Sequence, residues 1–297
     1  MKSKLVLTKK KRARVEAQKP SAIKGTPLNP NAAVQNKYAD KLTALVAEMV
    51  RQTRKEIESL FRKTVAKEFF AEDASIASHA KSVTDELSDR FNALFADRAE
   101  GAATSMIEGA QKSSSTSLLA SLRELSGGVA IKTSMVPEAL VPVVQASVAE
   151  NVGLIKSISA DYMQKVEGAV MRSITTGNGL ADLIPSLEKL DGMTKRRAEN
   201  IAYDQTRKVY NNVNKARMQA VGVKKFEWLH TGGSQHPRKD HIALSGKVFS
   251  FDNLPVIDPR TGERGIPGQA PNCRCRMVPV IEFADDDGDN EDDANAT

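Results

Sequence analysis

The apolar residues of this chain fall at helical spacing from Val34 onward, and this pattern constrains the fold more than any other feature. In the first such stretch, charged residues separate apolar positions that recur every three or four residues, at Tyr38, Leu42, Leu45, Met49, Ile57, Leu60 and Phe61. This spacing predicts an amphipathic helix of roughly 35 residues that ends near Phe70. Its length favours a helical hairpin or a partner-binding helix over an element of a compact bundle.

Further helices follow along the chain. The next has Val83, Leu87, Phe91, Leu94 and Phe95 on one face, and a Ser-rich segment after it closes with Gly127-Gly128, a helix stop. We also expect a break near Gly153 and a new helix start at Thr194, where a capping sequence precedes an apolar run. The expected helices are therefore 76–107, 142–176, 180–190 and 194–222.

The character of the chain changes at Val223. Three short runs rich in β-branched and aromatic residues follow, with Gly, Pro, Asn and Asp between them: KKFEWLH, GKVFSF and CRMVPVIEF. These runs predict a small antiparallel sheet with long loops, packed on the preceding helix. The fold class is α+β: mostly long α-helices followed by a small loop-rich C-terminal module with a short antiparallel sheet.

Both ends of the chain carry strong charge of opposite sign. Lys2 to Lys24 contains nine basic residues and one acid, whereas Ala284 to Thr297 contains seven acids and no base. Such composition is typical of solvated, disordered tails. Clustered cations on an arm also suit double-stranded DNA, bound without sequence preference through counterion release. The expected contacts are Lys9, Lys10, Lys11, Arg12 and Arg14.

Four potential metal ligands gather near the C-terminal end. His236 and His241 are five residues apart, Cys273 and Cys275 are two apart, and a Gly- and Pro-rich loop joins the pairs. Two imidazoles and two thiolates can form a tetrahedral zinc site, in which His230 could replace His236. The alternative is that the cysteines are buried packing residues and the histidines form loop hydrogen bonds. Zinc is thus the one cofactor that the sequence suggests.

Other function classes have less support. His236, His241, Asp240 and Arg238 could resemble the cluster of a metal-dependent nuclease, but no second carboxylate lies at a telling spacing. The chain has no Walker loop, no G-x-S-x-G and no G-x-G-x-x-G motif. It also has no run of 18 apolar residues that could span a membrane. A DNA-binding regulator would need a recognition helix, and none is readable. We therefore expect a protein that is not an enzyme.

Four segments together resemble a known family. They are RAENIAYDQTRKVYN (197–211), GVKKFEW (222–228), RKDHIALSGKVF (238–249) and PNCRCRMVP (271–279). In order and spacing they are similar to the phage Mu F-like minor head proteins, also described as phage head-morphogenesis proteins, over roughly 151–283. The positions that carry the resemblance in the last two segments are Arg238, Asp240, His241, Gly246, Phe249, Pro271, Asn272, Cys273, Arg274 and Cys275.

The sequence departs from the family pattern at the candidate ligands. Family members place a Cys pair before the L-x-G-K-V-F element and a His just before N-C-R-C. Here His236 and His241 occupy the first region, and Gln269-Ala270 precede Pro271. A metal site shared with the family would need His in place of the first Cys pair.

The resemblance implies a minor capsid protein of a tailed phage that acts in head morphogenesis. Such a protein would reside in the virion, inside the head near the portal vertex, and in the host cytoplasm during assembly. Its partners would be the portal protein or other head proteins and the packaged DNA, and it could form a homo-oligomer. We expect the apolar stripes of Val34 to Leu125 to dock on such a partner.

This reading divides the chain into five parts. A basic disordered arm and Pro-rich linker (1–30) precede a long-helix region (31–128). The helical part of the Mu F-like domain (129–222) is followed by the C-terminal module (223–283) and an acidic disordered tail (284–297).

Overall fold

The computed structural model describes residues 22–66, 76–125, 138, 140–232 and 237–282. Several of the residues singled out above lie outside these ranges. They are Lys9, Lys10, Lys11, Arg12 and Arg14 of the basic arm, His236, and the acidic tail.

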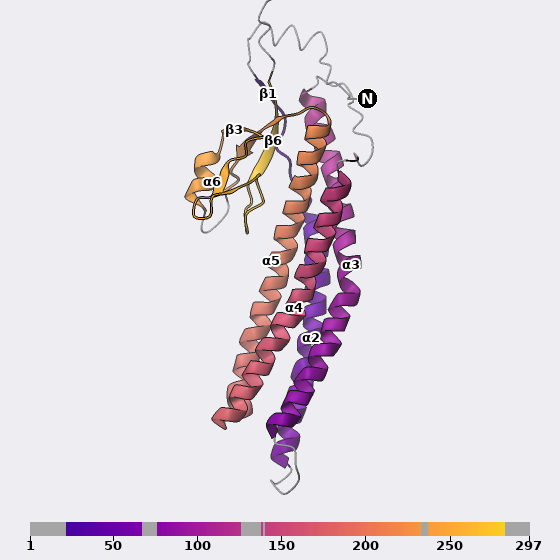
Figure 1. Ribbon diagram of the computed structural model, residues 1–297, viewed down its shortest axis with the longest axis vertical. Helices are drawn as coiled ribbons and strands as arrows, with labels where there is room; N and C mark the ends of the chain where they lie inside the picture. Colours follow the sequence, from indigo (N-terminus) through magenta and orange to yellow (C-terminus); the bar gives the residue numbers. More distant parts are fainter. Residues whose placement is uncertain (1–21, 67–75, 126–137, 139, 233–236, 283–297) are drawn as a thin grey trace, which may run out of the picture.

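Four long helices lie side by side and form a bundle in which successive helices run in opposite directions (Figure 1). They are α2 (Ala32–Ala66), α3 (Ile76–Leu125), α4 (Leu140–Thr176) and α5 (Leu180–Ala220). A small module of strands and one short helix lies beside the C-terminal end of α5. The expected α+β class, long helices followed by a small antiparallel sheet, is confirmed.

The apolar stripes of the helices form the core of this bundle. Tyr38, Leu42 and Met49 of α2 are almost completely buried, as are Phe91 and Phe95 of α3. Because these side chains pack against one another inside one chain, they are not available to another protein. The expectation that the stripes of α2 and α3 dock on a partner is therefore wrong, and so is the preference for a hairpin over a bundle element.

Three helix boundaries also differ from the expectation. The Ser-rich segment continues α3 to Leu125, because its hydroxyls find partners within the helix or across it. Ser117 donates to the Ser113 carbonyl at 2.8 Å and Ser114 to Asn214 Oδ1 at 2.7 Å. The helix α4 does not break at Gly153, since the flanking Ile155 is fully buried and its packing outweighs the roughly 1 kcal/mol cost of a helical glycine.

The expected boundary at 190–194 is likewise absent, and α5 is one continuous helix. The Thr194 hydroxyl donates to the Leu190 carbonyl at 2.8 Å, as a hydroxyl inside a helix does, instead of capping a new one. Leu187 and Ala198 are buried on either side of this point, so the core-facing stripe runs through it. In the part of the chain that the structure describes, none of the helices is both long and apolar enough to cross a membrane.

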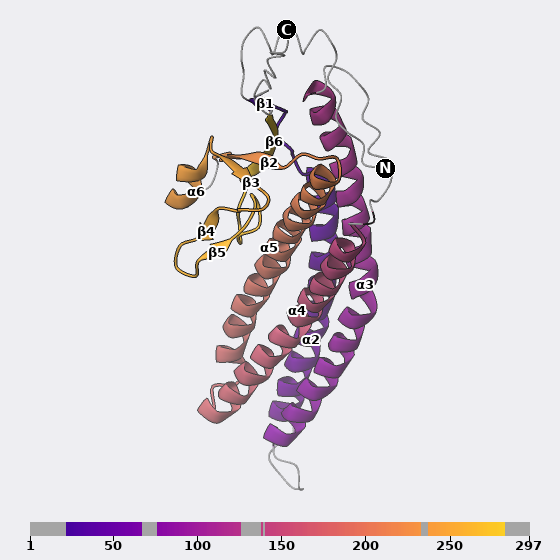
Figure 2. The same cartoon turned by 45° about the horizontal axis from the view of Figure 1, so that its top comes forward.

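The C-terminal module is built on a four-stranded antiparallel sheet in the order β1-β6-β2-β3 (Figure 2). The three strands expected from the sequence are present as β2 (Lys225–Leu229), β3 (Val248–Ser250) and β6 (Arg276–Glu282). The short helix α6 (Lys239–Leu244) lies between β2 and β3 in the chain. A separate two-stranded ribbon pairs β4 (Val256–Asp258) with β5 (Glu263–Arg264).

The fourth strand of the sheet, β1 (Ala22–Lys24), comes from the segment expected to be a linker. After β1, the Gly25 N–H donates to the Pro279 carbonyl and the Leu28 N–H to the Met277 carbonyl, both at 2.9 Å. The hydroxyl of Ser121 on α3 donates to the Thr26 carbonyl at 3.0 Å. Residues 22–28 therefore lie between the sheet and the end of α3, and they connect the module to the bundle.

Buried polar contacts link three helices of the bundle at one level. The Tyr38 hydroxyl of α2 donates to Asn151 Oδ1 of α4 at 3.0 Å, and Asn151 Nδ2 donates to Gln205 Oε1 of α5 at 3.3 Å. Asn151 also donates to the Ser147 carbonyl at 2.8 Å. Because buried polar groups are costly when unpaired, these bonds favour one axial register of the helices over its neighbours.

The fold predicts that Leu28 is a core residue although it lies in a Pro-rich segment. Leu28→Ala should lower the free energy of unfolding by about 2–5 kcal/mol, because it leaves a cavity where the side chain is 0% exposed. Denaturant titration followed by circular dichroism measures this change. Val141→Ala, at a side chain 46% exposed, is the matched control and should change stability by less than about 0.5 kcal/mol. Equal effects of the two substitutions would show that residues 22–28 do not pack on the bundle.

Candidate metal centre

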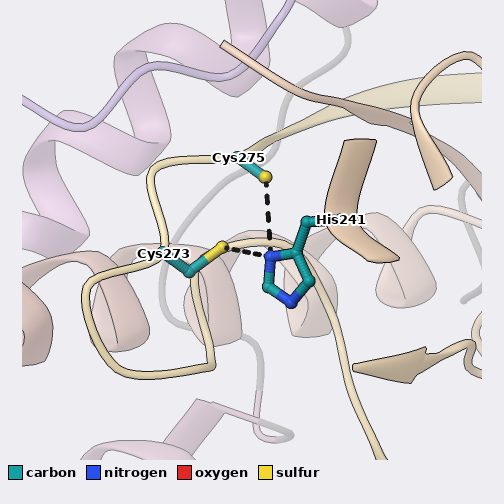
Figure 3. Close-up of side chains that lie close together, drawn as sticks. All are labelled: His241, Cys273 and Cys275. Carbon is teal, nitrogen blue, oxygen red and sulfur yellow. Dashed lines mark hydrogen bonds between the residues drawn. The ribbon is translucent and has the colours of Figure 1, made fainter. Parts of the chain in front are cut away.

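Two segments that lie 32 residues apart in the sequence bring His241, Cys273 and Cys275 together (Figure 3). His241 lies on α6, which begins after the β2 strand. Cys273 and Cys275 lie in the turn that leads into β6. The possible ligand atoms of the three residues all lie within 4.8 Å of one another, and each side chain is at most 6% exposed. The structure thus places three of the four expected ligands in one buried cluster.

The Nδ1 atom of His241 faces both sulfur atoms. It lies 3.4 Å from the Sγ of Cys273 and 3.9 Å from the Sγ of Cys275, and Figure 3 shows both sulfurs pointing toward this side of the ring. The two cysteines are free thiols. The cluster is therefore an arrangement of one nitrogen and two sulfur donors around a common point.

A second histidine approaches the same sulfur. His230 directly follows β2, and its Nδ1 lies 3.5 Å from the Sγ of Cys275. Its backbone N–H donates to the Ser245 hydroxyl at 3.0 Å, which fixes this part of the chain beside the end of α6. His236, the ligand that the sequence pattern favours, lies outside the described residues. Among the described residues, His230 is the further histidine whose ring nitrogen approaches a sulfur of the cluster.

The orientation of the His241 ring follows from its other nitrogen. Nε2 lies 3.1 Å from the Ile257 carbonyl oxygen, which can only accept a hydrogen bond. Nε2 must then carry the proton, so in the neutral ring Nδ1 presents its lone pair to the two sulfurs. A histidine that donates one N–H to a carbonyl and directs its other nitrogen outward is the usual arrangement of a metal ligand.

The electrostatics of the cluster favour a negative charge on Cys273. A hydrogen bond from the Cys275 thiol lowers the pKa of Cys273 to about 4, and the same contact raises the pKa of Cys275. The hydrogen bond with Cys273 in turn raises the pKa of His241. The Gly268 N–H also donates to Cys273 Sγ, at 3.4 Å. The site is thus arranged to stabilise thiolate sulfur, the form of cysteine that binds metals.

The loop that carries the cysteines is docked on α5. The backbone N–H of Asn272 donates to both carboxylate oxygens of Asp204, at 2.9 and 3.0 Å. Asn272 has a φ of 57°, a left-handed conformation that asparagine tolerates better than most residues. About two helical turns further along α5, Asn211 Nδ2 donates to the Pro267 carbonyl at 2.9 Å. Two residues of α5 therefore hold the ends of one loop.

The remaining positions of the family motifs support the same arrangement. Arg238 Nη1 donates to the Pro271 carbonyl at 2.9 Å and so connects the start of α6 to the cysteine loop. Gly246, with a φ of 80°, donates its N–H to the Trp228 carbonyl at 2.8 Å. Phe249 packs on Phe226 with ring centroids 6.0 Å apart. The Arg274 carbonyl accepts a bond from the Thr231 hydroxyl at 2.9 Å, and Asp240 is exposed on α6.

Sequence reasoning missed Asp204 and Asn211 as residues that position the site. Both lie in the segment 197–211, which was informative only as part of a resemblance. Burial raises the pKa of the Asp204 carboxyl group. The sequence shows only an acid within an amphipathic helix, and periodicity does not reveal that this acid meets a loop or which loop it meets.

An arginine-lined pocket lies next to the cluster. Arg207 of α5, Arg274 and Arg276 line it together with Cys275, and Gln35 of α2 closes one side. Burial and the nearby Arg274 lower the pKa of Arg207. In the described part of the chain, the buried Nε2 of Gln35 finds no hydrogen-bond partner. Several donors thus face one pocket, a setting suited to an anionic group.

Comparison with known proteins identifies the region that contains this site. Residues 164–278 match the family model described as "Phage Mu protein F like protein", which confirms the resemblance predicted from the sequence. A protein of Haemophilus influenzae described as uncharacterized is 34% identical over 139 residues, which are 47% of this chain. The matched part is 30% of that protein, so this chain spans less than a third of its relative's length. No solved structure matches the chain significantly.

The docking of the cysteine loop on α5 can be tested at Asp204. Asp204→Ala should lower the free energy of unfolding of the module by about 1–2 kcal/mol, because the Asn272 N–H loses its charged acceptor. Fluorescence of Trp228, the single tryptophan of the chain, reports this unfolding in a denaturant titration. Asp252→Ala, at an exposed acid in the turn after β3, is the control and should leave the midpoint unchanged. A midpoint unaltered by Asp204→Ala would remove Asp204 from the docking account.

Proposed function

From the match of residues 164–278 to the Mu F-like family, we propose that this chain is a minor head protein of a tailed phage that acts in head morphogenesis. The match supports a phage head-related protein. It covers the end of α4, all of α5 and most of the module, including His230, His241, Cys273, Cys275 and the loop contacts of α5. This match is the observation that carries the proposal.

We further propose that the protein docks on the portal or the inner face of the capsid through the outside of the molecule. The stripes of α2 and α3 are buried, so a partner has to use other surfaces. Ile242 on α6 and Val248 on β3 are large apolar side chains that are 45% and 38% exposed. Val248 belongs to β3, the edge strand of the sheet, whose free side could pair with or pack on another protein, and Ile242 lies on the short helix that precedes β3 in the chain.

The basic arm supplies the proposed contact with packaged DNA. Its cations, including Lys9, Lys10, Lys11, Arg12 and Arg14, precede β1, and β1 is fixed to the sheet by its pairing with β6. The arm would therefore extend from the opposite edge of the sheet to β3. Residues 29 and 30 line the arginine pocket described above, so a second group of cations lies close to the attachment of the arm.

The alternative of a metal-dependent nuclease finds little support in the surroundings of His241. That side chain is 3% exposed, its Nε2 is bonded to the Ile257 carbonyl, and its Nδ1 faces two sulfurs. A nuclease needs a metal ligand set that leaves a position open to water and to a phosphodiester. We therefore propose a structural role for the module.

Presence in the head tests the proposed function. In virions of the phage or prophage that encodes this chain, mass spectrometry should detect it at low copy relative to the major capsid protein. Chemical cross-linking should join it to the portal or an inner head protein. Heads assembled without this chain should be fewer or should retain less DNA. Its absence from purified heads that are otherwise complete would contradict the proposal.

The role of the arm is tested by its salt dependence. Deleting residues 2–19 removes eight cations and stops before β1, so the sheet is preserved. The slope of log K for duplex DNA against log salt should become shallower, by up to about 7 if every cation contacts a phosphate. Deleting residues 284–297 is the matched control, because it removes only acidic charge and should not flatten the slope. An identical slope with and without the arm would exclude it from DNA contact.

A further inference from the structure

We infer that His230, His241, Cys273 and Cys275 bind one zinc ion in a closed tetrahedral site. The inference rests on the geometry of the module and does not depend on the proposed role in phage heads. It also replaces His236, the ligand that sequence spacing favours, with His230.

The distances between donors are those of a zinc site. Tetrahedral zinc with Zn–S near 2.3 Å and Zn–N near 2.0–2.1 Å places a bound sulfur and nitrogen about 3.6 Å apart. The sulfur-to-nitrogen distances are 3.4 Å for Cys273 and His241, 3.9 Å for Cys275 and His241, and 3.5 Å for Cys275 and His230. Binding would thus need only small shifts of His241, Cys273 and Cys275, whose donor atoms already lie within 4.8 Å of one another, and a larger movement of His230 toward them.

Hydrogen bonding alone leaves the cluster incompletely paired. The Nδ1 of neutral His241 has one lone pair, which can accept one S–H bond, yet two sulfurs face it. Cys275 has one proton, yet its sulfur faces a nitrogen of His230 as well as His241. The donor atoms of His241, Cys273 and Cys275 lie within 4.8 Å of one another, and a single cation at their centre would satisfy all three. His230, which approaches Cys275, would complete the shell by moving toward that centre.

The types of donor select the ion. Thiolate and imidazole favour zinc over magnesium or calcium, which prefer oxygen ligands. Two thiolates and two neutral imidazoles also cancel the charge of Zn²⁺, so the buried site carries no net charge. The remaining contacts of the ligands are those of an outer shell: Ile257 orients His241, and the Gly268 N–H donates to Cys273.

The ion would have a structural role, because four protein ligands leave no position for water or substrate. It would join three segments: the end of β2 through His230, α6 through His241, and the turn before β6 through both cysteines. The same turn presents Asn272 to Asp204 of α5. Zinc would therefore hold the loop in the shape that docks on the helical bundle.

Metal content per chain tests the inference and the identity of the fourth ligand. Elemental mass spectrometry on protein purified without chelator should find about one zinc per wild-type chain. Cys275→Ser, His241→Ala and His230→Ala should each reduce zinc at least tenfold after dialysis. His236→Ala and His79→Ala are the matched controls and should retain it; His79 is an exposed residue of α3. Loss of zinc in His236→Ala with retention in His230→Ala would overturn the proposed ligand set.

Cobalt binding by the wild-type chain keeps the test valid if a variant fails to fold. Metal-free protein titrated with Co²⁺ should develop thiolate-to-cobalt absorption and tetrahedral d–d bands that saturate at one ion per chain. The helical circular dichroism signal should remain unchanged throughout the titration. All four ligands lie in the C-terminal module, and the four long helices that dominate this signal contain none of them. The absence of these bands, or of bound zinc in the wild-type protein, would contradict the inference.

Discussion

The burial of two cysteines against a histidine is the constraint on which the C-terminal module depends. The module is small, and the strands of its four-stranded sheet are three to seven residues long. A sheet of this size buries little apolar surface, so small modules usually need an additional crosslink such as a metal or a disulfide. The sulfur and imidazole atoms converge where β2, α6 and the turn before β6 meet, which is where one crosslink would fix most of the module.

The helix α5 extends this constraint to the bundle. One side of α5 carries Asp204 and Asn211, which bind the cysteine loop. Other residues of α5 pack against α2, α3 and α4 in the bundle. Residues 22–28 make a second connection between β6 and the end of α3. The module is thus attached to the bundle at two places. At one edge of the sheet, β3 is left without a neighbouring strand. At the other edge lies β1, which the basic arm precedes in the chain.

Sequence patterns were sufficient to predict the long helices and the strands β2, β3 and β6, because each lies in a run of apolar residues with a repeated spacing or a β-branched and aromatic composition. It was insufficient where tertiary packing outweighs a local preference. Gly153 suggests a break that the buried residues around it prevent, and the serines of α3 find acceptors that their composition does not show. The strand β1 lies in a Pro-rich segment without a run of β-branched or aromatic residues, so its sequence gives no strand signal, and what defines it is its pairing with β6.

At the candidate site, too, some residues could be recognised from the sequence and others only from tertiary contacts. Cys273, Cys275 and His241 were recognisable because potential ligands are rare in this chain and gather in one region. His230 was visible only as a substitute, since its approach to Cys275 depends on how β2 ends beside β6. The contacts of Asp204 and Asn211 cross more than fifty residues of sequence, and no local pattern encodes them.

The most direct test of this account is X-ray absorption spectroscopy at the zinc edge of the purified protein. A zinc ion bound by His230, His241, Cys273 and Cys275 should show a four-coordinate shell of two sulfurs at about 2.3 Å and two imidazole nitrogens at about 2.0–2.1 Å. A shell of oxygen and nitrogen atoms without sulfur, or one with a bound water in place of the second imidazole, would contradict it.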